Sequence, residues 1–229
     1  MLLTDFDNDR NAIINPERLI EKIESMPKIA VSCYSITSFN LMISDLNTIP
    51  IAFSSTANGR TVIYKADFNG VELALFMNNV GAPSSVSLLE DVYAMGVEKI
   101  ILFGTCGVLD KSIGDCSIII PTSAFRDEGT SYHYQPASDE IRVNANYVDV
   151  LSDLAKKNKL DYRIGKVWTT DAIYRETYAK MQKRKENGCI CVDMECSANQ
   201  AIADFRGKEV IQFFHAADNL DCHEWEPRS

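Results

Sequence analysis

The chain has 229 residues, of which 46% are apolar, and this is enough to bury a sizeable core in one large domain. Its 11 glycines and 7 prolines form no low-complexity run, which excludes collagen-like, linker-like and disordered proteins. The formal net charge of −9 argues against a nucleic-acid coat or a polybasic membrane contact, although a local basic pocket for a small anion remains open.

The seven cysteines favour a reducing compartment. Their odd number and low density are unlike a disulfide-stapled secreted domain, and no C-x-x-C spacing suggests a zinc or redox motif. The start of the sequence lacks a basic region followed by an apolar one, and no apolar run reaches the roughly 18 residues of a membrane span. We therefore expect a cytoplasmic protein. The three histidines have no metal-binding spacing, so we expect no metal and no organic cofactor.

The first half of the chain contains helix and hairpin signals. Its predicted elements are a helix after Asn15-Pro16 that stops before Pro27, a strand over 29–34, strands over 62–68 and 71–76, and a helix from Ser84 or Ser85 to Gly96. The helix after Pro16 is predicted because asparagine is a good N-cap and proline suits the first turn. Asn69-Gly70 separates the two strands and predicts a tight hairpin.

The second half alternates buried strands with helices. Its predicted elements are strands over 97–103 and 116–121, a helix over 147–154, strands over 164–168 and 189–192, a helix over 194–205 ending near Gly207, and a strand over 210–214. Alternation from end to end predicts an α/β protein, with residues 1–229 as a single domain and a mixed central sheet flanked by helices. In such sheets the ligand binds beyond the carboxyl ends of the strands.

Two glycine-containing segments follow predicted strands. Gly104-Thr105-Cys106-Gly107 is neither G-x-G-x-x-G nor a P-loop, so dinucleotide and triphosphate binding have no support. The Thr105 hydroxyl and nearby backbone N–H groups could hold a small anion, and the alternative is a turn with a buried cysteine. Gly81 precedes a helix whose N-terminus favours an anion, or it simply makes a tight turn.

Three carboxylates also stand just after predicted strands. Asp193 and Glu195 lie where a helix begins, so they either cap it or accept hydrogen bonds from a sugar diol. Asp218 follows the strand over 210–214 and can act as a general acid or cap a turn. His133 lies in the polar and aromatic segment 126–134 and, taken alone, is expected to be structural.

Five segments together resemble the nucleoside phosphorylase family, which includes purine nucleoside and uridine phosphorylases. They are ILFGTCG (101–107), IPTSAFRDEGTSYHY (120–134), TTDAIYRET (169–177), VDMECSA (192–198) and the loop of Asp218. The resemblance extends from about Ala12 to about Asp221. It implies a phosphorylase/hydrolase-like fold and attack of inorganic phosphate on the ribose anomeric carbon, which gives a free base and ribose 1-phosphate, as in purine salvage. It also implies a homo-oligomer, either a dimer or a hexamer built as a trimer of dimers.

The resemblance carries site roles onto particular residues. It implies Asp218 as the acid on the purine ring; Glu195, Met194 and His133 for ribose; Thr105, Arg18, Arg60 and Gly81 for phosphate; and Cys106, Gly107, Ile173 and Tyr174 for the base. In the family, the arginine near position 60 is lent across a subunit interface. Asp218 favours a purine somewhat over uracil, and the glutamine–arginine pair that reads uracil is not visible after Tyr174.

The sequence also departs from the family pattern. Leu102 stands where many relatives have a phosphate-binding arginine, and Ile14 stands where they have a loop glycine. Relatives usually continue into a C-terminal helix, so the chain is expected to be short there. The leading hypothesis is a nucleoside phosphorylase. The alternatives are a nucleoside hydrolase, in which water replaces phosphate, and a non-catalytic nucleoside-binding protein.

Overall fold

A computed structural model describes residues 5–222 and 224–228 of the chain. Across them one mixed sheet contains β1 (Ile29–Cys33), β2 (Ile49–Thr56), β3 (Gly59–Phe68), β4 (Val71–Met77), β5 (Lys99–Val108), β6 (Ile118–Asp127), β7 (Glu140–Arg142), β8 (Tyr162–Thr170), β9 (Cys189–Asp193), β10 (Glu209–Asn219) and β11 (Glu226–Pro227). The α-helices are α1 (Ile36–Asp45), α2 (Ala82–Met95), α3 (Val148–Lys157), α4 (Tyr178–Glu186) and α5 (Cys196–Arg206), and the 3₁₀ helices are η2 (Pro16–Arg18), η3 (Thr130–His133) and η4 (Ile173–Arg175). The predicted α/β class with a mixed sheet is confirmed.

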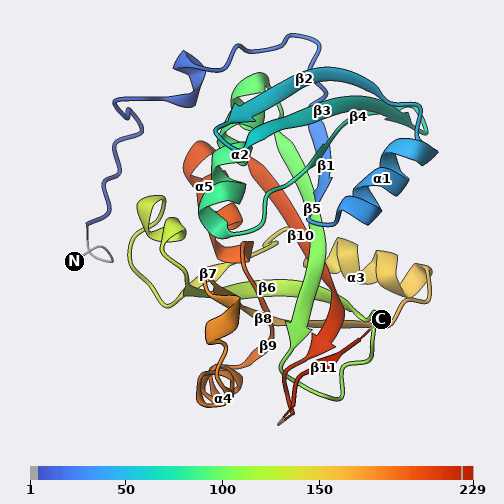
Figure 1. The fold of residues 1–229 in the computed structure, drawn as a ribbon, viewed down its shortest axis with the longest axis vertical. Coiled ribbons are helices and arrows are strands. Elements are labelled where there is room, and N and C mark those ends of the chain that lie inside the picture. Colours follow the sequence, from blue (N-terminus) through green and yellow to red (C-terminus); the bar gives the residue numbers. More distant parts are fainter. Residues whose placement is uncertain (1–4, 223, 229) are drawn as a thin grey trace.

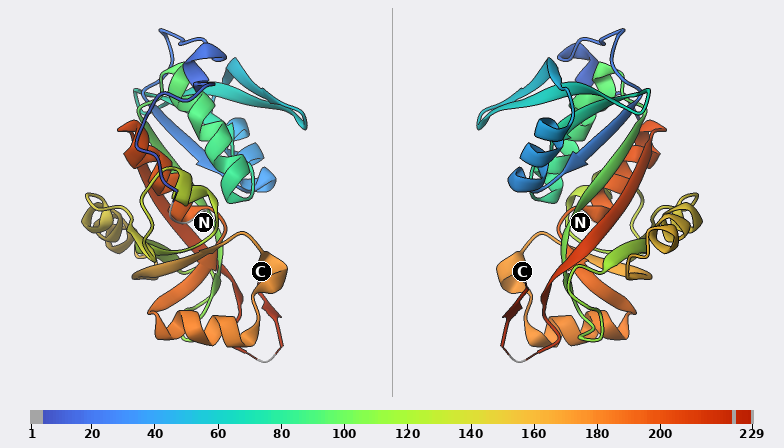
Figure 2. Two further views of the ribbon diagram at one scale, coloured as in Figure 1. Left: turned by 90° about the vertical axis from the view of Figure 1, so that its left-hand side faces the viewer. Right: turned by 90° about the vertical axis from the view of Figure 1, so that its right-hand side faces the viewer.

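Part of the sheet closes on itself. β5 pairs with β10 on one side and β9 on the other, and β10–β6–β8–β9 completes the ring. The order β5-β1-β4-β3-β2 continues from the ring as an open arm. Figure 1 shows the long strands β5 and β10 running from this arm into the ring, and Figure 2 shows β2 and β3 projecting beyond the ring. Ring closure gathers the carboxyl ends of β5, β9 and β10 in one place.

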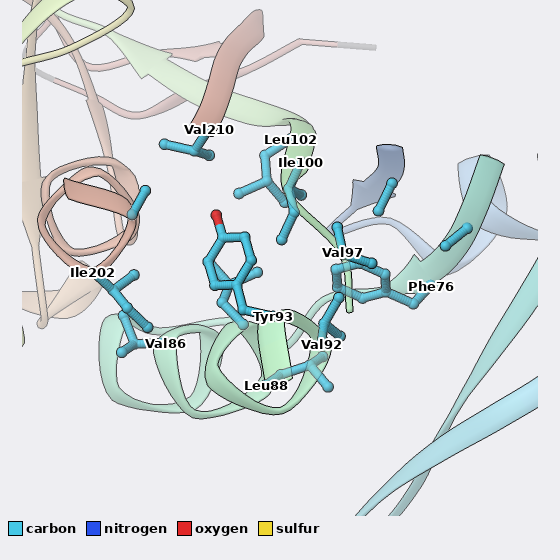
Figure 3. Close-up of a cluster of buried hydrophobic side chains, with 14 of the residues drawn as sticks. Phe76, Val86, Leu88, Val92, Tyr93, Val97, Ile100, Leu102, Ile202 and Val210 are labelled. Atoms are coloured by element: carbon cyan, nitrogen blue, oxygen red, sulfur yellow. The ribbon is translucent and has the colours of Figure 1, made fainter. Parts of the chain in front are cut away.

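The two faces of the arm bury different helices. Ala30 and Phe76 pack with α2 and α5 in one cluster, whereas their chain neighbours Val31 and Leu75 pack with α1 in another. This follows from the two-residue alternation of side chains along a strand. Figure 3 shows the first cluster, which includes Tyr93. The Tyr93 hydroxyl donates to the carbonyl of Glu209 at 3.3 Å. Each large side chain buried there stabilises the fold by about 1.5–3 kcal/mol.

The hairpin prediction is confirmed, but the first predicted helix is wrong. Asn69 and Gly70 both have positive φ, 54° and 82°, as a tight hairpin between β3 and β4 requires. After Asn15 the chain makes only the three-residue η2, because the Asn15 side chain accepts from the backbone N–H of Ala12 instead of capping a helix. Leu19 remains 74% exposed, whereas Ile20, Ile23 and Met26 of the same pattern pack against the core cluster without forming a helix.

The predicted cap of α2 is also wrong. Gly81, with φ of 93°, holds the N-cap position, and as a glycine it has no side chain that could cap the helix. Ser85 lies one turn inside and is fully buried, where its hydroxyl donates to Asn199 at 2.8 Å and accepts from Asn78 at 2.9 Å. The predicted stop at Gly96 is confirmed, since Gly96 is the C-cap with φ of 125°.

Two segments expected to be loops are parts of strands. The Gly104–Gly107 segment lies within β5, and Asp218 lies within β10, because these strands pair in parallel far beyond their apolar parts. Their register shifts between Ala216 and Asp218, so that Asp218 stands opposite Gly107. Such a bulge redirects a side chain near the end of a strand.

Within the described residues, no helix combines the length and the apolar character needed to cross a membrane.

Candidate active site

A cavity of about 700 Å³ opens at the carboxyl ends of β5, β9 and β10, which is the edge where α/β sheets bind ligands. Its volume is in the usual range for small-molecule sites. It is lined by Tyr34, Val80, Thr105, Cys106, Gly107, Ile173, Tyr174, Glu176, Tyr178, Met181, Val192, Asp193, Met194, Glu195, Phe214, Asp218, Leu220, Cys222 and Trp225.

The cavity is acidic. Glu176, Asp193, Glu195 and Asp218 line it, and no lysine, arginine or histidine does so among the described residues. Burial, the largest cause in each case, raises the pKa of Asp193 to about 6, that of Glu176 to about 7 and that of Glu195 to about 8. At neutral pH the cavity therefore holds protons on some of its carboxyl groups.

Asp193 holds the first turn of α5 in place. Its carboxylate accepts from the backbone N–H groups of Glu195 at 2.9 Å and Cys196 at 2.7 Å, and from the Thr169 hydroxyl at 2.7 Å. These donors keep Asp193 ionised at neutral pH, and its negative charge adds to the rise in the pKa of Glu195. The expectation that an acid caps this helix therefore holds for Asp193.

We expect Asp193→Ala to lower the free energy of unfolding by about 2–4 kcal/mol, because it leaves a buried hydroxyl and two backbone N–H groups without an acceptor. Urea denaturation near neutral pH measures this change. Asp153→Ala is the matched control, since that side chain is 76% exposed on α3 and should change stability by less than about 0.5 kcal/mol. Equal effects of the two substitutions would contradict the assignment.

Glu195 does not cap α5 with its side chain. Its carboxyl group instead lines the cavity and accepts from the backbone N–H of Gly81 at 2.5 Å. The Gly81 N–H, expected to bind phosphate, is thus engaged by Glu195 in this structure. Only 7% of Glu195 is exposed, so its carboxyl group lines the cavity from a position that is largely shielded from bulk solvent.

Trp225 holds the Asp218 side chain by a hydrogen bond, and Gly107 leaves space beside it. The indole N–H of Trp225 donates to its carboxylate at 2.8 Å, and Trp225 itself comes just before β11, which pairs with β10. A Cβ atom added to Gly107 would lie 3.2 Å from a carboxylate oxygen of Asp218 and would collide with Leu220. Glycine at 107 therefore makes room for the acid that the bulge in β10 places opposite it.

Tyr34 closes the cavity wall at the end of β1. Its hydroxyl accepts from the side-chain amides of Asn199 at 2.8 Å and Asn78 at 3.3 Å. Burial raises its pKa well above the ordinary value, and the charge of Glu195 adds to this effect. The Tyr34 hydroxyl is therefore a fixed neutral group.

The structure brings most of the residues assigned from the sequence to this cavity. Those that line it are Thr105, Cys106, Gly107, Ile173, Tyr174, Met194, Glu195 and Asp218. Thr105 and its neighbours come from β5, Glu195 from the start of α5, and Asp218 from β10. Segments more than 100 residues apart thus meet at one site.

Three assigned residues lie away from the cavity. Arg18 donates to the carbonyl of Ile13 at 3.1 Å beside η2, and Arg60 lies over the Phe53 ring at 4.4 Å near the β2–β3 turn. His133 is exposed at the end of η3. In this single chain none of the three lines the cavity.

The fold and the cavity define an α/β protein with a small-molecule site rich in carboxyl groups. Residues 28–228 match the family described as the phosphorylase superfamily, and the chain belongs to this family. The resemblance inferred from the five sequence segments is thereby confirmed.

Individual relatives are distant. The chain is 29% identical to a guanosine phosphorylase of Halorubrum lacusprofundi over 150 residues, which is 63% of this chain and 60% of that protein. It is 27% identical to a DeoD-type purine nucleoside phosphorylase of Bacillus cereus over 161 residues, which is 69% of this chain and 68% of that protein.

Solved structures share the fold. Uridine phosphorylase from Vibrio fischeri superposes with a TM-score of 0.76 at 20% identity, covering 84% of this chain and 80% of that one. Purine nucleoside phosphorylase from Toxoplasma gondii, in complex with immucillin-H, gives 0.75 at 16% identity, covering 86% and 79%.

Proposed function

We propose that the protein cleaves the N-glycosidic bond of a nucleoside, with inorganic phosphate as the acceptor, and yields a free base and ribose 1-phosphate. The observation that carries this proposal is that Glu195 and Asp218, from different elements, line one cavity of nucleoside size in a chain of the phosphorylase superfamily. Bond cleavage passes through an oxocarbenium-like state. Such a site must therefore hold the sugar, place an anion on one face and neutralise charge on the departing base.

The proposed roles divide the cavity. Glu195, with Met194, binds the ribose hydroxyls, because a carboxylate can accept two hydrogen bonds from a diol. Asp218 delivers or shares a proton with the base as the bond breaks. Cys106, Gly107, Ile173 and Tyr174 surround the base. Because an acid at 218 suits the ring nitrogen of a purine, we favour purine nucleosides over uridine.

The phosphate half of the site needs a positive charge from elsewhere. The Thr105 hydroxyl lines the cavity, but Arg18 and Arg60 do not. We propose that Arg60, exposed near the β2–β3 turn, and His133 reach the site of a second copy of the chain in a homo-oligomer, a dimer or a hexamer. Arg18 is the remaining candidate for phosphate.

Hydrolysis is the second candidate, and a specific observation favours it. The only charged side chains in the described lining of the cavity are carboxyl groups, and position 102 is a buried leucine. The lining of a single chain therefore offers no guanidinium to phosphate. Losing such a charge-assisted contact costs on the order of 2 kcal/mol in anion binding. Water needs no such group.

Base release measured with and without phosphate separates the candidates. With phosphorolysis we expect release to depend on phosphate, ribose 1-phosphate to be the product, and Arg60→Ala to raise the KM for phosphate at least about tenfold. Lys65→Ala, which removes a partly buried cation on the same strand that is paired with Glu72, is the control. Full-rate release with free ribose as product would establish the hydrolase. Nucleoside binding without turnover would leave a binding protein.

A further inference from the structure

A network of polar side chains leads from the cavity wall into the core. It consists of Tyr34 after β1, Asn78 after β4, Ser85 on α2, Asn199 on α5 and Gln212 on β10. The last four are buried and none of them lines the cavity, whereas Tyr34 does. Because a buried polar group costs free energy unless it is hydrogen-bonded, every donor in the network needs an acceptor. The network therefore constrains the one hydroxyl that a ligand can contact.

The orientation of the Asn199 amide is set from the core. The NH₂ group of Gln212 donates to the backbone carbonyl of Cys196 at 3.0 Å, and a carbonyl can only accept. The side-chain oxygen of Gln212 therefore faces Asn199 at 3.2 Å and requires a donor there. Asn199 must present its NH₂ group, and this same group donates to the Tyr34 hydroxyl at 2.8 Å.

Tyr34 receives a second N–H group from Asn78. The Asn78 side-chain oxygen accepts from the backbone N–H of Asn79 at 2.9 Å. Its NH₂ group therefore faces Ser85 at 2.9 Å and Tyr34 at 3.3 Å. Ser85 gives its one hydroxyl proton to the Asn199 oxygen at 2.8 Å, so it has none for Tyr34. The Tyr34 oxygen thus accepts from two amides, and its own proton must point elsewhere.

The proton of the Tyr34 hydroxyl has two possible acceptors. One is the Ser85 oxygen at 3.3 Å, which is long for a hydrogen bond between two hydroxyl groups. The other is an oxygen of a molecule bound in the cavity, which can approach to about 2.7 Å. Tyr34 lies at the Thr105 end of the cavity, since a Cβ atom added to Gly104 would lie 2.9 Å from the tyrosine ring. A ligand oxygen at that end therefore meets a donor.

We propose that Asn199 is a positioning residue, which by donating to Tyr34 keeps the Tyr34 proton directed into the cavity, toward an oxygen of the group that attacks the sugar. This inference rests on the proposed function, in which that group is phosphate at the Thr105 end. A hydroxyl that rotates freely offers a phosphate oxygen its lone pairs as well as its proton, and lone pairs repel it. Asn199 removes this choice before the ligand binds, so that binding does not have to order the hydroxyl.

A double-mutant cycle tests whether Asn199 acts through the Tyr34 hydroxyl. We expect Tyr34→Phe to raise the KM for phosphate about tenfold, the scale of one hydrogen bond to a charged group. The KM for the nucleoside should change less than about twofold. Asn199→Leu should raise the KM for phosphate about fivefold, because the hydroxyl is present but less well oriented. The double variant should be no worse than Tyr34→Phe alone, since it has no hydroxyl to orient.

Urea denaturation of the same variants separates this role from a structural one. Asn199→Leu should lower the stability equally with and without the Tyr34 hydroxyl, because Ser85 and Gln212 lose their partner in both cases. Its effect on the KM for phosphate should be confined to the protein that has the hydroxyl. Gln200→Leu, at the next position of α5, is the control and should leave both KM values unchanged.

Asn78→Ala is the second variant, and it keeps the test decisive if Asn199→Leu does not fold. It removes the other N–H group that Tyr34 accepts, so it too should raise the KM for phosphate only where the hydroxyl is present. Calorimetry of phosphate binding gives the same cycle without turnover.

The proposed function and the role of Asn199 can fail separately. If base release is independent of phosphate, the proposed reaction fails, and the cycle is then measured on kcat/KM for the nucleoside. A loss in Asn199→Leu that disappears in the Tyr34→Phe background upholds the role of Asn199. Effects of the two substitutions that multiply in the double variant, or a Tyr34→Phe protein with unchanged constants, overturn the inference.

Discussion

Asp218→Asn should lower kcat for base release by about 10²–10³-fold and change nucleoside KM little. Asparagine has nearly the same shape and can still accept the indole N–H of Trp225, so the side chain should stay in place. It cannot deliver a proton, and the base must then leave as an anion. Steady-state kinetics with purine nucleosides, at saturating phosphate and near neutral pH, measures the loss.

A substrate with an activated leaving group sharpens this test. 4-Nitrophenyl riboside needs no acid at its leaving group, so Asp218→Asn should cleave it at nearly the rate of the unmodified protein. Asp153→Asn, exposed on α3, is the control for both substrates. An unchanged rate with purine nucleosides, or an equal loss with both substrates, would remove Asp218 from acid catalysis.

Trp225 offers a second control. Trp225→Phe removes the donor to Asp218 but leaves the acid, so it tests positioning alone. We expect a loss of kcat of about tenfold, the scale of one hydrogen bond to a charged group. The two variants together separate how Asp218 is held from what it does.

The sequence predicts the sheet where strands are apolar and fails where they become polar. The runs over 97–103 and 210–214 identify the cores of β5 and β10, because only buried strands are apolar on both faces. Gly104–Gly107 and Asp218 resemble loop residues, yet the long parallel pairing of β5 with β10 makes them strand. That pairing joins segments about a hundred residues apart, and the local hydrophobic pattern of either segment does not indicate it.

Exposed elements were missed for a different reason. α4 consists mainly of charged residues and buries only Met181 and Arg184, so it lacks the apolar stripe that indicates a helix. Its N-terminus nevertheless fixes the turn that places Glu176 in the cavity. Trp225 was missed too, because only the pairing of β11 with β10 brings it to Asp218.

The charged site residues that follow buried strands could be placed from the sequence, whereas those in exposed segments could not. Glu195 and Asp218 follow apolar runs that form buried strands, so locating those runs was enough to place both acids at one edge of the sheet. Arg18 and Arg60 lie in exposed segments whose position relative to the cavity depends on how the chain folds back, or on a second copy.

Glu195→Gln should lower activity and raise stability in alkaline solution. Above about pH 8, where Glu195 is ionised, we expect kcat/KM for ribonucleosides to fall about 10–100-fold, because an amide accepts the ribose diol less well than a carboxylate. A 2′-deoxynucleoside, which lacks one of the two hydroxyls, should lose less. Parallel assays with a ribonucleoside and its 2′-deoxy analogue test the sugar contact, and equal losses would contradict it.

The stability change follows from the pKa of Glu195, which burial raises from 4.5 to about 8. Folding therefore takes up a proton between these two pH values. The stability that this proton contributes is complete below about pH 4.5 and is lost as the pH rises through about 8. Glutamine stays neutral, and its amide oxygen can still accept from the Gly81 N–H. The variant should thus become more stable than the unmodified protein as the pH rises, by on the order of 3 kcal/mol above about pH 8.

Urea denaturation at about pH 5 and pH 8.5 measures this difference, with Glu24→Gln at an exposed position as the control. A variant destabilised equally at both pH values would mean that Glu195 mainly holds the loop of Gly81. Ionised Glu195 lowers the stability of the fold and is nevertheless needed for turnover, so the protein retains it for its chemistry. Replacing a purely structural residue would instead lower stability and activity together.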